Sequence, residues 1–348
     1  MSSHASQSEV ASSTDAQAPQ SPLAIAHAWL QHTPAVALAI VTATWGSSPV
    51  PVGSHMVIAS EDRFAGSVSG GCIEGDIIAA AADVMADGTP RLLDFGVSNE
   101  TAWRVGLPCG GNVQVLVLRL QAGRDLPLLA RIANAAKERE RLLLEVGIAT
   151  GALRLFDDDE ARRHGLSAYL DADRIGIIPL KAGQALVQAL LPQQQVVVIG
   201  ATHIAQHLVA MLRHIDCQTI VVDPRSAYAS AERFADIRRV TLWPREAFAN
   251  MPIDPSTAVV ALSHVADIDD DALACALHSG AFYIGALGST RNHARRKERL
   301  LAAGFSAQQI DRIRAPIGLD IGAVTPSEIA ASILAEIILA RRGAKRKA

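Results

Sequence analysis

Short apolar runs and amphipathic segments alternate along the chain, and their pattern differs between its two halves. In the first half, the apolar run 35–44 predicts a buried strand, 55–60 and 63–67 predict a hairpin, and 73–85 predicts a helix. In the second half, strand and helix patterns alternate regularly from 195 to 303. Regular alternation favours a parallel sheet with helices on both faces. We therefore expect an α/β protein, in which an N-terminal α/β domain precedes a Rossmann-like, doubly wound parallel-sheet domain.

The same pattern suggests where the domains begin and end. Residues 1–21 are mainly Ser, Ala and Gln and are predicted to form a disordered tail. A charged, irregular segment, 157–183, precedes Pro192, where we place the domain boundary. The expected domains are therefore 22–191 and 192–348, and a chain of 348 residues is long enough to give each its own core.

Composition excludes several classes of protein. With 49% hydrophobic and 19% charged residues the chain is globular, and a net charge of -3 gives it no general affinity for nucleic acid or membranes. No apolar run reaches about 18 residues, and the N-terminal segment has neither a secretory nor a twin-arginine signal. The four cysteines are too widely spaced for a zinc ribbon or a disulfide framework: Cys72, Cys109, Cys217 and Cys275. We expect a cytoplasmic protein with reduced thiols that binds neither nucleic acid nor membranes.

The most distinctive stretch is the glycine-rich segment 66–76, which joins a predicted strand to the predicted helix 73–85. Its candidate binding residues are Ser69, Gly70, Gly71, Cys72 and Glu74. Ser69 is expected to cap the helix, whose first N–H groups and dipole suit a phosphate and favour the thiolate of Cys72. The alternative is a tight turn with a small buried cysteine, and both interpretations remain open.

A second cysteine–diglycine element precedes the predicted strand 113–120 and consists of Cys109, Gly110 and Gly111. Its order mirrors that of the first element, in which two glycines precede the cysteine. The mirrored composition suggests that the two elements form two walls of one pocket.

The second half begins with a strand and a glycine turn at Gly200. Asp223 follows 23 residues later, which is the spacing at which a dinucleotide-binding fold places an acid on a ribose hydroxyl. Thr202 stands where the fingerprint has its second glycine, and its branched side chain crowds the approach of a pyrophosphate. Ordinary NAD binding, a modified dinucleotide mode and a turn that binds nothing all remain open.

Another glycine turn, 285–291, leads into a basic helix and contains Ser289 and Arg291. Such a helix start can hold a phosphate with Arg291 as a two-pronged donor, and the alternative is a solvated charged face.

Signatures of serine hydrolases, P-loop kinases and zinc proteases are absent from the sequence.

Linked motifs along the chain resemble the XdhC/CoxI family of molybdoenzyme maturation proteins. They lie at 46–53, 69–75, 107–111, around Gly200, at 283–289, and at 315–330. The resemblance covers about residues 23–342 and implies an N-terminal cofactor-binding domain in a chaperone rather than a turnover enzyme. Thr202 departs from the glycine that is common in the family. Cysteine in the first loop, with the second element later, is closer to the CoxI-type branch than to the xanthine-dehydrogenase-type branch.

The resemblance implies a ligand and partners. The ligand would be the molybdenum cofactor, as molybdopterin cytosine dinucleotide or as the simpler molybdopterin. The protein would support sulfuration of the cofactor and insert it into an apo-molybdoenzyme of the xanthine oxidase family, as a xanthine dehydrogenase accessory factor does. A cysteine desulfurase and the cofactor cytidylyltransferase would be further partners, and a homodimer would help to hide a labile cofactor.

The resemblance also implies roles for the candidate residues. Cys72 and Cys109 would lie near the molybdenum, as metal contacts or sulfur-transfer thiols, beside Ser69, Gly70, Gly71, Glu74, Gly110 and Gly111. The phosphate or nucleotide end would be held by Gly200, Asp223, Ser289 and Arg291. An NAD(P)-dependent oxidoreductase and a catalytically silent regulator are the alternative functions, although the first leaves both cysteine–diglycine loops unexplained.

Overall fold

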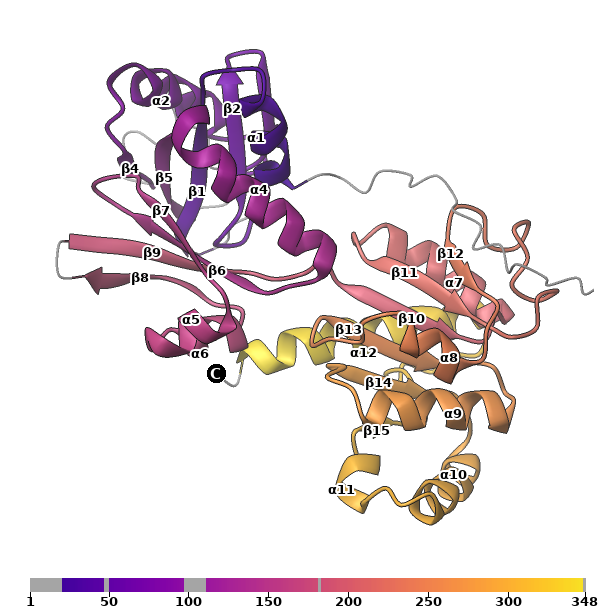
Figure 1. Cartoon of the computed structure of the whole chain (residues 1–348). Coiled ribbons are helices and arrows are strands. Elements are labelled where there is room, and N and C mark those ends of the chain that lie inside the picture. The colour runs from indigo at the N-terminus through magenta and orange to yellow at the C-terminus, as the bar shows by residue number, and fades with distance from the viewer. Residues whose placement is uncertain (1–20, 47–49, 97–110, 181–182, 347–348) are drawn as a thin grey trace, which may run out of the picture. The chain divides into compact units, whose positions relative to one another are not determined.

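The computed structural model describes residues 21–46, 50–96, 111–180 and 183–346 (Figure 1). The chain divides into two compact units, one ending at Pro192 and the other beginning at Gln193. None of the helices within these described ranges is long and apolar enough to span a membrane.

The first unit contains a five-stranded antiparallel sheet with the order β3-β2-β1-β5-β4. Its strands are β1 (Ala35–Trp45), β2 (His55–Ser60), β3 (Arg63–Gly66), β4 (Arg91–Phe95) and β5 (Asn112–Gln121). Both faces of the central strand β1 are buried, since successive side chains point to opposite faces. This explains why β1 is a continuous apolar run rather than an alternating one.

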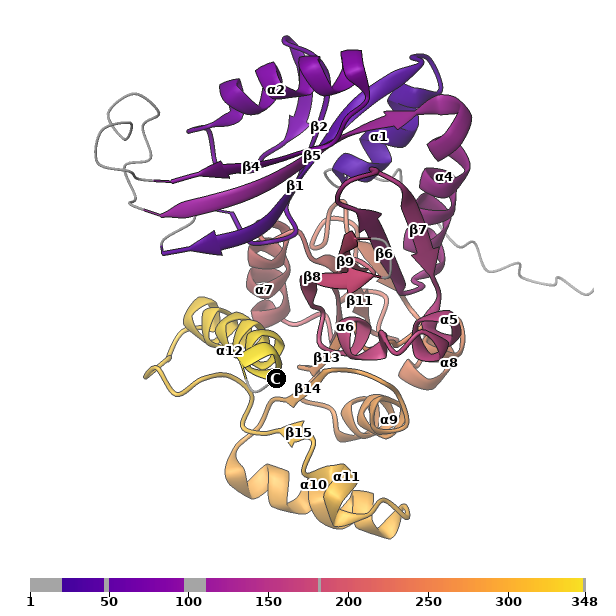
Figure 2. The same cartoon turned by 90° about the vertical axis from the view of Figure 1, so that its left-hand side faces the viewer.

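Helix α2 (Glu74–Asp87) covers one face of this sheet through Ile77, Ala81 and Val84. The other face packs on α1 (Pro22–Leu30), on α4 (Ala122–Glu138) and on a second sheet (Figure 2). The second sheet has the order β7-β6-β9-β8, with β6 (Leu142–Gly147), β7 (Leu153–Phe156), β8 (Ile175–Leu180) and β9 (Gly183–Leu190). Helices α5 (Asp158–Arg163) and α6 (Ser167–Asp171) pack on its outer face.

A polar contact joins the two sheets inside this unit. The Nε2 atom of His55 on β2 lies 2.9 Å from Oε1 of Gln188 on β9, and Nε2 of Gln188 donates to the carbonyl of Gly53 at 3.0 Å. Burial lowers the pKa of His55 to about 4, so its imidazole is neutral at pH 7.

The second unit is a six-stranded parallel sheet with the order β12-β11-β10-β13-β14-β15. Its strands are β10 (Gln195–Ile199), β11 (Gln218–Val222), β12 (Arg238–Val240), β13 (Thr257–Ala261), β14 (Tyr283–Ala286) and β15 (Ile313–Arg314). In sequence order this is the 3-2-1-4-5-6 arrangement of dinucleotide-binding folds. The prediction of a doubly wound parallel sheet is therefore confirmed.

Helices cover both faces of this sheet. One face packs on α7 (His203–Arg213) and α12 (Pro326–Arg346), and the other on α8 (Pro244–Ala249), α9 (Ala266–Leu277), α10 (Thr290–Ala302) and α11 (Ala307–Ile310). The strand order reverses between β10 and β13, and the loops that follow these strands lie at the carboxyl edge of the sheet. In open α/β sheets, ligands bind at this edge beside the reversal.

Candidate functional site

The glycine-rich loop of the first unit is built around the carboxylate of Glu74, the first residue of α2. Oε1 of Glu74 accepts hydrogen bonds from Ser67 Oγ at 2.6 Å and from Ser69 N–H at 3.0 Å. Its Oε2 accepts from Gly71 N–H at 2.9 Å, from Ile73 N–H at 3.2 Å, and from the hydroxyl of Ser69. Backbone N–H groups of this loop, including that of Ile73 at the start of the predicted helix, therefore donate to a carboxylate of the chain itself.

These contacts change the electrostatics of Glu74. Partial burial alone would raise its pKa, but the hydrogen bonds from Ser67 and Ser69 outweigh burial and lower the pKa to about 2. Glu74 is thus ionised at pH 7, and its carboxylate is the acceptor on which the hydroxyl and N–H groups of the loop converge. Its predicted contact with a cofactor remains a prediction.

The predicted N-cap at Ser69 is wrong. The helix begins at Glu74 with Ile73 as its N-cap, which offers no capping side chain. The hydroxyl of Ser69 instead accepts hydrogen bonds from Cys72 N–H at 2.9 Å and Ile73 N–H at 3.0 Å. Ser69 therefore closes a separate turn just before the helix, because its short side chain can reach the backbone three and four residues further on.

Within the described ranges, no residue covers the outer side of this loop at Gly71. Gly70 and Gly71 are exposed at φ values of +79° and +112°, which residues with a Cβ rarely adopt. A Cβ on Gly71 would meet no atom within 4 Å, so the space above it is open. Cys72 follows with a free, half-buried thiol. The loop thus presents two glycine peptides and one sulfur side by side.

The second cysteine–diglycine element lies mostly outside the described residues. Cys109 and Gly110 belong to that part, whereas Gly111 is buried directly before β5. Val113, two residues further on, belongs to the same core cluster as Ile73, the residue after Cys72. The pocket between the two elements remains a prediction, as do the molybdenum contacts of both cysteines. Over the described ranges, no group of three or more His, Cys, Asp or Glu side chains could hold a metal ion.

The second unit places the Gly200 turn against the loop after β13. Gly200 has a φ of +94°, and a Cβ on it would lie 2.4 Å from Ser263 Cα, so only glycine fits. Thr202 is the N-cap of α7, and its hydroxyl accepts from Ala205 N–H at 3.4 Å. Thr202, which departs from the dinucleotide fingerprint, therefore caps the first turn of α7.

Asp223, at the end of β11, is turned inward and has no exposed surface. Its Oδ2 accepts from Ala201 N–H and from Arg225 Nη2, both at 2.8 Å, and its Oδ1 accepts from Arg225 Nε at 2.9 Å. Burial would raise the pKa of Asp223, but these hydrogen bonds lower it below its ordinary value. The expected ribose contact remains a prediction, and in this structure the carboxylate instead braces the glycine turn.

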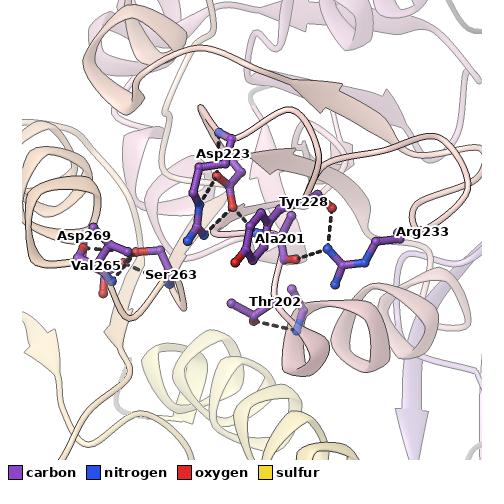
Figure 3. A network of polar contacts seen from close by, with 10 residues as sticks. Ala201, Thr202, Asp223, Tyr228, Arg233, Ser263, Val265 and Asp269 are labelled. Carbon is purple, nitrogen blue, oxygen red and sulfur yellow. Dashed lines mark hydrogen bonds and ion pairs between the residues drawn. The ribbon is translucent and has the colours of Figure 1, made fainter.

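Arg233 connects the segment after β11 to the Gly200 turn by hydrogen bonds (Figure 3). Nη1 of Arg233 donates to the carbonyls of Ala201 at 2.9 Å and Tyr228 at 2.6 Å, and its Nη2 donates to Gln206 at 3.2 Å. The guanidinium of Arg225 lies 4.1 Å from the centre of the Tyr228 ring. Sequence reasoning missed these residues, although an arginine two places after Asp223 was a usable signal.

A buried network holds the loop after β13. Oδ1 of Asp269 accepts from Ser263 N–H at 3.1 Å and from its hydroxyl at 2.6 Å, and Val265 N–H donates to that hydroxyl at 3.0 Å. Burial raises the pKa of Asp269. His264, between Ser263 and Val265, is exposed with a φ of +62°, a conformation uncommon outside glycine. No pattern in the sequence pointed to His264.

The predicted phosphate residues of the second glycine turn have different surroundings. Ser289 is the N-cap of α10, and its hydroxyl accepts from Asn292 N–H at 3.3 Å. Arg291 is exposed in the first turn of that helix. His203, at the start of α7, is also exposed, with its ring 4.8 Å from that of His207. The roles predicted for Ser289 and Arg291 remain predictions.

A cavity of about 590 Å³ lies elsewhere in the second unit, beside the start of β14 and the end of α12. Its polar lining residues are Tyr283, Arg312, Arg314 and Glu336. None of the predicted site residues lines it, so it is separate from the carboxyl edge.

Comparisons with known proteins settle the family. The chain matches the XdhC and CoxI family over residues 29–96 and the XdhC Rossmann domain over residues 196–337. The chain belongs to the XdhC/CoxI family. The resemblance stated from the sequence motifs is thereby confirmed.

Two relatives of this XdhC/CoxI chain have descriptive names. It is 27% identical over 296 residues to the molybdenum cofactor insertion chaperone PaoD of Escherichia coli K12, covering 85% of this chain and 80% of PaoD. It is 23% identical over 314 residues to a protein of Bacillus subtilis 168 that is named as a probable component of xanthine dehydrogenase, covering 88% and 93% of the two chains.

One solved structure is also similar. It is described as a xanthine dehydrogenase from Bacillus halodurans and matches with a TM-score of 0.70 and 23% identity, over 93% of this XdhC/CoxI chain and 96% of that one. At that identity the likeness supports the fold alone.

Proposed function

We propose that this protein is a molybdenum-cofactor chaperone. It binds the pterin cofactor, supports its sulfuration, and delivers it to an apo-molybdoenzyme of the xanthine oxidase family. Membership of the XdhC/CoxI family and the similarity to PaoD, named as a molybdenum cofactor insertion chaperone, support this role. The geometric observation that carries the proposal is the loop 67–74, where Glu74 accepts hydrogen bonds from the residues on either side of the free Cys72, next to two exposed glycines.

The chemistry of that loop suits the metal end of the cofactor. A thiolate is a soft ligand that can contact molybdenum or carry sulfur, and Cys72 is the thiol that the loop presents. Gly70 and Gly71 let a flat ligand approach the backbone closely. Glu74 keeps the loop in shape while its charge is compensated internally. We propose the same role for Cys109.

The second unit would hold the other end of the cofactor. Its strand order is that of dinucleotide-binding folds, and its carboxyl edge carries the Gly200 turn and the start of α10 with Ser289 and Arg291. This supports the cytosine dinucleotide form of the cofactor over the simpler molybdopterin. A cysteine desulfurase, the cofactor cytidylyltransferase and a second copy of the chain are the further partners that we propose, in the cytoplasm.

The test is elemental and nucleotide analysis of the full chain produced together with the cofactor-synthesis enzymes. We expect molybdenum and pterin in the purified protein, with one CMP released per molybdenum. Cys72→Ala and Cys109→Ala are expected to fold but to lose support for sulfuration of a partner enzyme. Cys275→Ala, which removes a half-buried free thiol in the other unit, is the matched control. Folded wild-type protein without pterin would overturn the proposal.

The strand order also favours a second candidate, an NAD(P)-dependent oxidoreductase. The inward orientation of Asp223 argues against it, because an NAD-type ribose would find no exposed carboxylate there. Fluorescence titration with NADH and NADPH separates the two functions. Tight, saturable binding with substrate-dependent oxidation would favour the oxidoreductase.

A further inference from the structure

The segment after β11 carries the exposed ring of Tyr228, with the guanidinium of Arg225 stacked on it and that of Arg233 further away, 5.9 Å from the ring centre. The guanidinium carbon of Arg225 lies 4.1 Å from the centre of the Tyr228 ring, and Tyr228 is 46% exposed. A large exposed aromatic residue held against a guanidinium is a flat surface on which a planar group can stack.

The charge and the orientation of Arg225 are both fixed. Its Nε and Nη2 donate to the two carboxylate oxygens of Asp223 at 2.9 and 2.8 Å, and its backbone N–H donates to Oδ1 at 2.9 Å. Asp223 therefore neutralises Arg225, so that the pair has little charge to offer an anion. The flat face of the guanidinium and the ring of Tyr228 are what this edge presents.

The stack lies beside the Gly200 turn. The same nitrogen, Nη1 of Arg233, donates to the carbonyl of Ala201 in the turn and to the carbonyl of Tyr228 (Figure 3). Tyr228 N–H also donates to the carbonyl of Arg225 at 2.9 Å. The stack is therefore ordered in advance and adjoins the place where dinucleotide-binding folds hold phosphates.

We propose that Arg225 and Tyr228 form a stacking platform for the base of a nucleoside diphosphate whose phosphates lie at the Gly200 turn. The site thus recognises its ligand by the planar base, while Asp223 holds Arg225 in place. This inference rests on the proposed function only in naming the nucleotide end of the cofactor as the source of that diphosphate. Free nucleotides share the same chemistry.

The test compares a nucleotide with a base-free sugar phosphate, and the Tyr228 variants isolate the contribution of the base because CDP also has a second phosphate. Calorimetric titration of the purified full chain uses CDP, which has a base, and ribose 5-phosphate, which has none. We expect CDP to bind more tightly. Tyr228→Ala should weaken CDP about tenfold, within the range measured for base–aromatic stacking, and leave ribose 5-phosphate binding as it was. Tyr228→Phe, which keeps the ring, should recover the CDP affinity.

A second variant probes the guanidinium. Arg225→Ala would leave Asp223 buried without its partner and could unfold the domain, so Arg225→Lys is used instead. Lysine keeps the positive charge beside Asp223 but has no planar face, and CDP binding should weaken. Phe64→Ala is the matched control, since Phe64 is 45% exposed on β3 of the other unit. A Tyr228→Ala protein that binds CDP as the wild type does would overturn the platform, and so would a wild type that binds CDP no better than ribose 5-phosphate.

Failure of the platform and failure of the chaperone role give different results. Wild-type protein that carries molybdenum and pterin, but binds CDP no better than ribose 5-phosphate, would overturn the platform and leave the chaperone role intact. Protein that carries no pterin, but binds CDP in a way that depends on Tyr228, would overturn the chaperone role and support the platform with a free nucleotide as its ligand.

Discussion

Arg296 of α10 lies 3.6 Å from Asp269 of α9, and both side chains are almost completely buried. Asp269 accepts hydrogen bonds from Ser263 in the loop after β13, and Nη2 of Arg296 donates to the carbonyl of Leu287 in the loop after β14 at 3.2 Å. The pair therefore connects two neighbouring loops at the carboxyl edge of the parallel sheet. Through Ser263 it also supports the Gly200 turn.

Removing the arginine from this pair should destabilise the protein strongly. Arg296→Met leaves Asp269 as an unpaired buried carboxylate, and losing one partner of a buried pair costs about 3–5 kcal/mol. Urea unfolding of the single variant measures this loss. The double variant with Asp269→Asn should recover part of the stability, because no buried charge is left without a partner. A double variant less stable than the sum of both single changes would contradict the coupling.

A methyl group at Gly200 should cost more than its backbone conformation alone explains. Gly200 and Gly304 share a φ of +94°, but a Cβ on Gly200 meets the backbone of Ser263 whereas one on Gly304 meets nothing within 4 Å. Gly304→Ala should therefore lose only about 1–2 kcal/mol for the left-handed conformation. Gly200→Ala should lose a further ~1–3 kcal/mol from overpacking. Equal losses in thermal unfolding would show that the close approach to Ser263 is unimportant.

Neutralising Glu74 should loosen the loop that presents Cys72. In Glu74→Gln, an amide nitrogen replaces one acceptor oxygen, so N–H donors such as that of Gly71 lose their partner. We expect a loss of about 1–3 kcal/mol, the usual cost of leaving such a group unsatisfied. Alkylation of Cys72, followed by mass spectrometry, should become faster. Glu61→Gln at an exposed position of the same unit is the control. Unchanged stability and unchanged alkylation would rule out this role for Glu74.

Acid should destabilise the first unit in two successive pH windows, which overlap only between about pH 4.5 and 4. The pKa of Glu74 is about 2 in the folded protein against an ordinary value of 4.5, so its contribution is complete above pH 4.5 and is lost as the pH falls toward 2. The pKa of buried His55 is about 4 against 6.5, so its contribution is lost between pH 6.5 and 4.

The two windows provide their own control in unfolding experiments. Glu74→Gln should flatten the decline below pH 4.5 and leave the decline between pH 6.5 and 4.5 as in the wild type. A variant whose stability follows the wild-type curve below pH 4.5 would show that Glu74 does not titrate as described.

The sequence predicted the parallel sheet because its signals are local. Apolar strands such as β10 and β13 are buried on both faces, and each is followed by a turn and a helix. The alternation of strands and helices and the turn at Gly200 could be predicted without knowing which distant residues are in contact. The inter-sheet contact of His55 with Gln188 joins residues 133 positions apart, so no local pattern could reveal it.

The candidate site was harder to predict because spacing does not say which way a side chain turns. The sequence placed Glu74 among the cofactor-binding candidates but did not show that its carboxylate accepts hydrogen bonds from its own loop. Asp223 stood at the ribose spacing, yet Arg225 and Ala201 bind it from inside. The left-handed backbone of His264 lies in a loop that Asp269 holds through Ser263, and it leaves no compositional trace.

The internal hydrogen bonds of the loop at Cys72 affect how fast a ligand would bind to the loop and leave it. Because the hydrogen bonds to Glu74 order Ser69, Gly71 and Ile73 from within the chain, a ligand at this loop would not have to restrict the chain. The conformational entropy of the loop is lost during folding rather than on binding, and release of the ligand does not restore it. Under the proposed function, the cofactor would enter and leave this loop without rearranging it, which is the kinetic behaviour that the proposed carrier requires.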